Sequence, residues 1–247
     1  MSNTNIIWEG IYSTFNDAPV DDEVFYSDKW LSKQVQNITD IMGGNQLASI
    51  TKNYPLTPVV AMILQQQEYI KILDYGGGLG KEYLSLINSI KTFSQIECTI
   101  VETSAIVKQG IIIFENDNNI TFLDGFPDKN TRFDLVHAGS SLQYVDNWKE
   151  FLEELVSSKP KYLLLSDILA GDIPSFVTVQ LYYGKNIRVR FLNKDELFAW
   201  LNHLGYTIIL EEYYDGDIFL NRKALPMDNF PSEYQLKYSQ NYIFCKN

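Results

Sequence analysis

The sequence predicts an α/β fold built on a doubly wound, mostly parallel seven-stranded sheet, with an antiparallel C-terminal edge strand and an N-terminal helical cap. Short apolar, β-prone runs alternate with segments of about a dozen residues that have helical spacing, which is the pattern of βαβ crossovers. A glycine-rich turn joins the first such run to the first such helix. A late helix followed by two strand-like runs suits an antiparallel hairpin at one edge of the sheet.

The elements can be placed in order along the chain. The chain changes character near residue 70, which divides a helical cap or lid (1–69), with helix-like spacing at 27–41 and 58–69, from the main α/β domain (70–247). Residues 178–191 are expected to be extended. The predicted strands are 70–75, 98–101, 120–123, 133–138, 162–167, 206–211 and 242–245, and the helices between them are 81–91, 104–116, 147–158 and 195–204, the last with Asn193 as its N-cap.

Length and charge restrict the class of protein. A chain of 247 residues fits one medium-sized globular unit with an appendage, and a hydrophobic content of 45% is enough for a sizeable core. The formal net charge of -11 repels a polyphosphate backbone and an anionic membrane surface. We therefore expect no nucleic-acid partner. No sequence feature specifies an oligomeric state.

The cysteines and the apolar segments indicate the compartment. Cys98 and Cys245 are too few for a disulfide framework and lack the C-x-x-C spacing of a zinc or redox site. The N-terminus has no basic segment followed by an apolar one, and no apolar run approaches the roughly 18 residues of a membrane span. We expect a cytoplasmic protein without a membrane span and without a metal site.

The glycine-rich turn indicates a nucleoside-binding site. The segment Asp74-Tyr75-Gly76-Gly77-Gly78-Leu79-Gly80 lies where the first strand leads into the first helix, the position at which open α/β sheets bind ligands. Glu102 ends the second strand 22 residues after Gly80, where a carboxylate can accept hydrogen bonds from ribose hydroxyls. Loop and acid together predict a bound nucleoside.

The spacing of the glycines separates the kinds of nucleotide. A dinucleotide fingerprint starting at Gly76 needs a small residue at position 81, which is Lys81 here. A phosphate-binding Walker loop needs a hydroxyl after Gly80-Lys81, and the chain has Glu82. An NAD-dependent oxidoreductase is therefore disfavoured, and the pattern that remains is D-x-G-x-G-x-G.

These residues resemble the class I S-adenosylmethionine-dependent methyltransferases, which have a Rossmann-like fold. The resemblance covers residues 70–168: the glycine motif at 72–80, the ribose acid Glu102, the adenine-contacting turn 124–126, and the fourth strand with its following loop at 133–144. It implies S-adenosyl-L-methionine as cofactor and S-adenosyl-L-homocysteine as product. The residues that it implies for cofactor binding are Asp74, Tyr75, Gly76, Gly77, Gly78, Gly80, Glu102, Thr103, Asp124, Gly125, Phe126, Ala138, Gly139 and Ser140.

A narrower resemblance concerns the acceptor. The segment 8–12, the glycine loop, Tyr183-Gly184 and the segment 191–193 resemble a methyltransferase family found in bacterial surface-polysaccharide gene neighbourhoods. This implies a hydroxyl, amine or carboxylate acceptor on a polysaccharide precursor, and a role in polysaccharide biosynthesis. Two alternatives stay open: a small-molecule O- or N-methyltransferase of another pathway, and a non-catalytic nucleoside-binding partner subunit.

Catalytic candidates are few. The two histidines are His137, at the end of the fourth strand and facing the expected cofactor edge, and His203, whose place at a helix C-terminus favours a structural role. His137 can equally be a buried core histidine. We take His137 and Tyr144 as catalytic candidates, with Asp167 and Tyr182 as further possibilities near strand ends.

A basic strip marks a candidate substrate site. Between Asp172 and Asp195 the chain has four basic side chains and no acidic one. If this segment is extended, Arg188 and Arg190 share one face and could bind a phosphate or carboxylate of an anionic acceptor, with Tyr183 nearby. The alternative is a solvated edge strand whose charges discourage aggregation.

Overall fold

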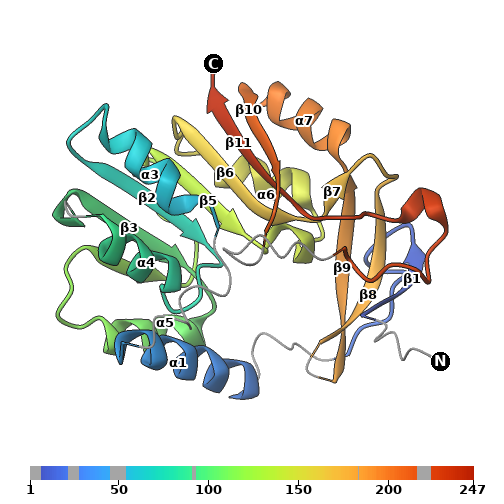
Figure 1. Ribbon diagram of the computed structural model, residues 1–247, viewed down its shortest axis with the longest axis horizontal. Coiled ribbons are helices and arrows are strands. Elements are labelled where there is room, and N and C mark those ends of the chain that lie inside the picture. The colour runs from blue at the N-terminus through green and yellow to red at the C-terminus, as the bar shows by residue number, and fades with distance from the viewer. Residues whose placement is uncertain (1–6, 22–27, 45–53, 91–92, 183, 216–223) are drawn as a thin grey trace.

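The computed structural model describes residues 7–21, 28–44, 54–90, 93–182, 184–215 and 224–247 and contains two sheets with flanking helices (Figure 1). The helices and strands, in chain order, are β1 (Trp8–Tyr12), α1 (Asp28–Met42), α3 (Leu56–Leu64), β2 (Ile70–Tyr75), α4 (Lys81–Ser89), β3 (Ile96–Val101), α5 (Ser104–Ile113), β4 (Ile120–Leu123), β5 (Leu135–Gly139), α6 (Trp148–Leu155), β6 (Tyr162–Ile168), β7 (Ala170–Gly171), β8 (Phe176–Tyr182), β9 (Lys185–Asn193), α7 (Lys194–His203), β10 (Tyr206–Tyr213) and β11 (Gln240–Lys246). Short 3-10 helices lie at Phe93–Gln95, Leu142–Tyr144 and Ser232–Tyr234.

The larger sheet has seven strands in the order β10-β11-β6-β5-β2-β3-β4. Strands β4, β3, β2, β5 and β6 are parallel to one another, and β11 runs antiparallel to both β6 and β10. This confirms the predicted sheet with its antiparallel C-terminal hairpin, in which β11 lies one position inside the edge strand β10. The strand order reverses at β2, which pairs with both β3 and β5, so the switch point at which such sheets bind ligands lies beside β2.

Helices cover both faces of this sheet and bury its strands. Successive residues of β2 point to opposite faces: Ile72 belongs to a buried cluster that includes residues of α1, α3, α4 and α5, whereas Leu73 belongs to a cluster that includes residues of α6 and α7. Burial on both faces explains why the parallel strands are nearly continuous apolar runs. The predicted helix cap at Asn193 is present, since its side-chain oxygen accepts a hydrogen bond from the Glu196 backbone N–H at 3.1 Å.

A second sheet of four strands, β1-β8-β9-β7, lies beside the hairpin edge of the larger one (Figure 1). In it, β1 pairs antiparallel with β8, and Trp8 lies opposite Gln180. The sequence pattern predicted extended structure at 178–191 but no strand at 8–12. The predicted helices of the first 69 residues are present as α1 and α3, whereas β1 packs with the C-terminal half of the chain.

The lengths of the helices decide whether any of them can cross a membrane. The longest helix of the described segments, α1, has 15 residues, and none of the described helices is long and apolar enough to cross a bilayer. Cys98, which is buried in β3, and Cys245 in β11 are both free thiols.

Candidate active site at the carboxyl end of the parallel strands

The glycine loop between β2 and α4 has the backbone that its sequence requires. Gly76 and Gly78 have φ values of 71° and 57°, in the left-handed region that side chains disfavour. A Cβ on Gly78 would lie 3.2 Å from the side-chain oxygen of Gln34, because α1 reaches over the loop at this point. A Cβ on Gly77 would lie 2.4 Å from Oδ2 of Asp74. The loop backbone therefore approaches the Asp74 carboxylate so closely that only glycine fits at position 77.

Glu102 follows β3 and is bonded to the glycine loop. Its Oε1 accepts a hydrogen bond from the Gly78 backbone N–H at 3.2 Å, and its Oε2 accepts one from Thr103 at 2.8 Å. Burial raises the pKa of Glu102, while these two backbone N–H groups act in the opposite direction. The carboxylate is thus fixed in position, and each of its oxygens retains a second lone-pair direction for a ligand hydroxyl.

A pocket of about 290 Å³ opens beside Glu102 and brings together seven of the predicted cofactor residues. In its wall the Ser104 hydroxyl donates to Oδ2 of Asp124 at 3.2 Å, and Phe126 stacks on Tyr75 with ring centres 5.4 Å apart. Its volume is at the lower end of the range for small-molecule sites. A neighbouring pocket of about 490 Å³ shares its 124–126 wall. The pocket beside Glu102 is lined by Tyr75, Gly76, Val101, Glu102, Thr103, Ser104, Asp124, Gly125 and Phe126.

Asp74 and His137 form a buried polar chain beneath the loop. Oδ1 of Asp74 lies 2.8 Å from Nδ1 of His137, and Nε2 of the same ring lies 3.1 Å from the Ser166 hydroxyl on β6. Both ring nitrogens of His137 are therefore bonded within the protein, and only 1% of the residue is exposed. This geometry fits a positioning role for His137 better than direct contact with an acceptor.

Oδ2 of Asp74 is buried and has no hydrogen-bond partner among the described residues. An unsatisfied buried carboxylate oxygen is costly, and here it borders the glycine loop. It is a candidate contact for a cationic ligand group.

The other predicted residues of β5 and its loop lie farther along the same edge. Ala138 is buried, and Gly139 leaves room for Tyr54, whose ring would lie 2.5 Å from a Cβ there. Ser140 bonds to Tyr54 and Asp167 and does not line the Glu102 pocket. Tyr144 approaches Gln180 of β8 at 3.4 Å, and burial raises its pKa, so it is a weak acid in this position. Its catalytic role stays a prediction.

The basic strip on β9 has the predicted alternation, but its arginines contact their own chain. Arg188 Nε donates to the Ala18 carbonyl at 2.8 Å. Arg190 donates to the Asp146 carbonyl at 3.1 Å, and its guanidinium lies 4.9 Å from the ring centre of Phe15. These contacts fasten neighbouring segments to the second sheet, so we leave both arginines out of the proposed acceptor site. Tyr183 lies outside the described residues.

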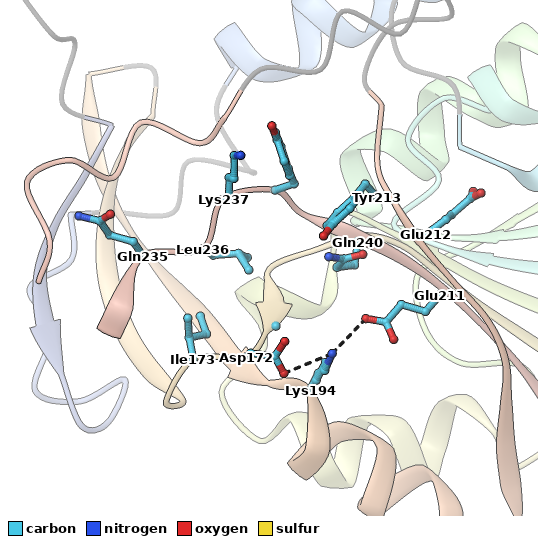
Figure 2. Close-up of a pocket in the computed structure, with 12 residues that line it drawn as sticks. Asp172, Ile173, Lys194, Glu211, Glu212, Tyr213, Gln235, Leu236, Lys237 and Gln240 are labelled. Carbon is cyan, nitrogen blue, oxygen red and sulfur yellow. Dashed lines mark hydrogen bonds and ion pairs between the residues drawn. The ribbon is translucent and has the colours of Figure 1, made fainter. Parts of the chain in front are cut away.

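A further pocket of about 430 Å³ is lined by the last residues of β10 and the first residue of β11 (Figure 2). Lys194, at the start of α7, lines this pocket and forms ion pairs with Asp172 at 3.2 Å and with Glu211 at 3.4 Å. Gln240 lines this pocket, whereas its neighbours Ser239 and Asn241 contact Asp167. Because adjacent strand residues point to opposite faces, this pocket is separate from the region around Asp167.

Several residues of this edge were not predicted from sequence, namely Tyr54, Glu82, Ser166, Tyr214 and Ser239. Glu82 lies in the first turn of α4 and is buried, and burial raises its pKa to about 7. The others come from segments far apart in the chain and carry no motif. Asp167, by contrast, could be singled out from the sequence, because it lies at the end of a predicted parallel strand.

Comparisons with known proteins agree with this architecture. A family model described as a methyltransferase domain matches residues 49–211. The 1,6-didemethyltoxoflavin-N1-methyltransferase of Burkholderia thailandensis has a similar fold, with a TM-score of 0.54, 13% identity, and coverage of 93% of this chain and 94% of that one. A search of curated protein sequences found no match.

Two further solved structures are similar. The protein in complex with the methyltransferase activator Trm112 of Haloferax volcanii has a TM-score of 0.56 and 11% identity, covering 89% of this chain and 94% of that one. The [4+2]-cyclase SpnF has a TM-score of 0.53 and 14% identity, with 82% of each chain covered. At these identities the likeness shows the fold alone.

The fold and the family match together define a class I S-adenosylmethionine-dependent methyltransferase. The chain belongs to the methyltransferase-domain family, whose model spans its residues 49–211. It is a transferase with S-adenosylmethionine as its cofactor.

Proposed function

We propose that the glycine loop, Glu102 and Asp124 hold the nucleoside part of S-adenosylmethionine in the pocket of about 290 Å³. The observation that carries this proposal is Glu102, which lines that pocket and whose carboxylate is held by the Gly78 and Thr103 backbone N–H groups. A fixed carboxylate beside β3 can accept both ribose hydroxyls. Asp124, which lines the same pocket, can accept from the adenine amino group, and Phe126 offers an apolar face for the base.

The residues beneath the loop fit the methionine part. Its ammonium group needs acceptors, and Oδ2 of Asp74 is a buried oxygen without a partner among the described residues. His137 fixes the other oxygen of Asp74 at 2.8 Å and so keeps Oδ2 directed to one side. When bound, S-adenosylmethionine supplies a methyl group activated by a sulfonium. The chain has to orient an acceptor and exclude water.

For the acceptor we propose a small molecule or a glycan-type precursor. The narrower family resemblance supports a surface-polysaccharide precursor. The two free thiols are in keeping with our placement of the reaction in the reducing cytoplasm. Because the contacts of Arg188 and Arg190 are internal, this proposal does not require an anionic acceptor.

The alternative is a partner subunit that binds the nucleoside without transferring its methyl group. The similarity to a [4+2]-cyclase illustrates that this fold also occurs in a protein of another activity. Label transfer from methyl-labelled cofactor therefore has to accompany any binding measurement.

The test combines calorimetry with label transfer. We expect the protein to bind S-adenosylmethionine and S-adenosylhomocysteine and not NAD. Folded protein that binds neither sulfur nucleoside would overturn the proposal. Binding without label transfer, across a panel of sugar-nucleotide, phenol and amine acceptors, would favour the partner-subunit alternative.

A further inference from the structure

Two neighbouring strand ends carry side-chain residues in a left-handed backbone conformation. Asp167, near the end of β6, has a φ of 52°, and Ser140, directly after β5, has a φ of 49°. Such backbone costs free energy for residues other than glycine and concentrates at functional sites. Here it turns the two side chains toward each other, and the Ser140 hydroxyl donates to Oδ2 of Asp167.

The Asp167 carboxylate is the centre of a hydroxyl network. The Ser239 hydroxyl donates to Oδ1 at 2.5 Å, and the Asp167 backbone N–H donates to Oδ1 of Asn241 at 3.1 Å. On the other side, the Tyr54 hydroxyl donates to Ser140 at 2.8 Å. Every hydroxyl in this chain gives its single proton in the direction of Asp167. The network therefore ends on a proton acceptor and starts at the Tyr54 oxygen, which can still accept a hydrogen bond.

Tyr214 adds a polar atom that no protein group satisfies. Its hydroxyl is buried and has no hydrogen-bond partner within the described part of the chain. Its ring centre is 5.7 Å from that of Tyr54. Burial, followed by the charges of Asp167 and Glu82, raises the pKa of Tyr214, so the hydroxyl keeps its proton. A buried hydroxyl without a partner beside such a network marks a place for a polar ligand group.

The network borders the residues that we assign to the methionine part of the cofactor. The Tyr54 ring is centred 5.3 Å from the ring of His137, which bonds Asp74 beneath the glycine loop. Ser141, next to Ser140, would lie 3.0 Å from a Cβ on Gly76. Asp167 and the glycine loop therefore face a common region at the carboxyl end of the sheet.

We propose that Asp167 is the proton acceptor for the methylated group, reached through the Tyr54 and Ser140 hydroxyls, and that the hydroxyls of the adjacent Tyr54 and Tyr214 rings contact an acceptor with an O–H or N–H nucleophile. This inference rests on the proposed function. As the acceptor's lone pair bonds to the methyl carbon, the sulfur–carbon bond breaks and its electron pair stays on sulfur. The O–H or N–H proton goes to the Tyr54 oxygen as the Tyr54 and Ser140 hydroxyls pass their own protons along the chain to the Asp167 carboxylate, so charge and atoms balance. An acceptor of this class is a hydroxyl compound or an amine, which loses a proton on methylation, and not a thioether, which has none to lose.

The test needs no knowledge of the acceptor. Sinefungin resembles S-adenosylmethionine but has an amine-bearing carbon in place of the methylated sulfur, so its ammonium occupies the place of the transferred methyl. Calorimetry on Asp167→Asn should show sinefungin affinity lowered at least about tenfold, the loss expected when a carboxylate charge near the ammonium, within the same partly enclosed region, is neutralised. The affinity for S-adenosylhomocysteine, which has no group there, should change less than about twofold.

Asp172→Asn is the matched control, because this aspartate is five residues further along the chain and belongs to the separate pocket of Figure 2. It should leave both affinities unchanged. Unchanged sinefungin affinity in Asp167→Asn, or an equal loss for both ligands in a folded sample, would overturn the proposal. If Asp167→Asn does not fold, Tyr54→Phe provides the same comparison with a smaller selective loss. Wild-type protein that binds neither ligand would instead refute the proposed function.

Discussion

Oδ1 of Asp74 on β2 and Nδ1 of His137 on β5 lie 2.8 Å apart, and each residue is only 1% exposed. This pair joins two neighbouring parallel strands directly beneath the glycine loop. It links the core of the sheet to the proposed cofactor site, because the other oxygen of Asp74 borders that loop.

His137→Leu should be strongly destabilising. It leaves Asp74 as a buried carboxylate without its partner and removes the bond to Ser166, for which a loss of about 3–5 kcal/mol in the free energy of unfolding is expected. Urea denaturation measures the loss. The other histidine provides the control: His203→Leu changes an exposed side chain and should cost under about 0.5 kcal/mol. Similar small losses for both variants would show that the pair is unimportant.

Glu82→Gln should change how stability depends on pH. Burial raises the pKa of Glu82 to about 7, above its unfolded value of 4.5. The folded state therefore retains a proton that the unfolded state loses as the pH rises from 4.5 to 7, and wild-type stability falls across that window. The loss in the free energy of unfolding that Glu82 causes amounts to roughly 3 kcal/mol. This loss should be absent in Glu82→Gln.

Urea denaturation of both proteins at pH 4.5, 6 and 8 measures this difference. At pH 4.5 the two should be similar, and at pH 8 the glutamine variant should be the more stable. Glu153→Gln on the exposed face of α6 should follow the wild type at every pH. Parallel curves for wild type and Glu82→Gln would contradict the assignment.

Glu102→Gln should weaken cofactor binding. The neutral amide can no longer accept from both ribose hydroxyls and the Gly78 and Thr103 backbone N–H groups as a carboxylate does. Hydrogen bonds to a charged group contribute about 1.5–3 kcal/mol, or about 10- to 150-fold in affinity for S-adenosylhomocysteine. Calorimetry should show no change for Glu97→Gln, which alters an exposed carboxylate on β3, the strand that precedes Glu102. If Glu102→Gln keeps the wild-type affinity, the ribose must bind elsewhere.

Arg190→Ala should affect stability and leave cofactor binding intact. The side chain is packed on Phe15 and bonded to the Asp146 carbonyl, so its removal should cost about 1–2 kcal/mol of the free energy of unfolding. Thermal denaturation and calorimetry with S-adenosylhomocysteine measure the two effects. Lys185→Ala, at the start of the same strand, is the comparison variant. A raised KM for an anionic acceptor, without loss of stability, would restore the anion-binding interpretation.

The periodicity of the chain predicted the large sheet closely. The strands at 70–75 and 120–123 match β2 and β4 residue for residue, and the remaining five lie within two residues of their predicted bounds. This succeeded because parallel strands buried on both faces are apolar runs, which a local pattern records. The glycine loop could also be predicted from the sequence, because the glycines that its left-handed backbone requires lie within five consecutive residues.

Local pattern could not place contacts between distant segments. Strand β1 has no apolar alternation that distinguishes it from a turn, and it forms only because β8 provides its hydrogen bonds, with Trp8 opposite Gln180. The arginines of β9 alternate as predicted, but nothing in their own segment reveals that Ala18 and Asp146 would receive their hydrogen bonds.

The sequence by itself determined the class of protein: strands, helices, glycine loop and ribose acid lie in one continuous stretch, and their order specifies a nucleoside-binding α/β sheet. Only the tertiary structure decided which polar side chains meet at its edge. Tyr54 is 86 residues from Ser140, and Ser239 is 72 residues from Asp167. Their hydrogen bonds exist because parallel strands β5 and β6 end side by side and the C-terminal hairpin returns alongside them. No local periodicity encodes a contact that chain topology creates.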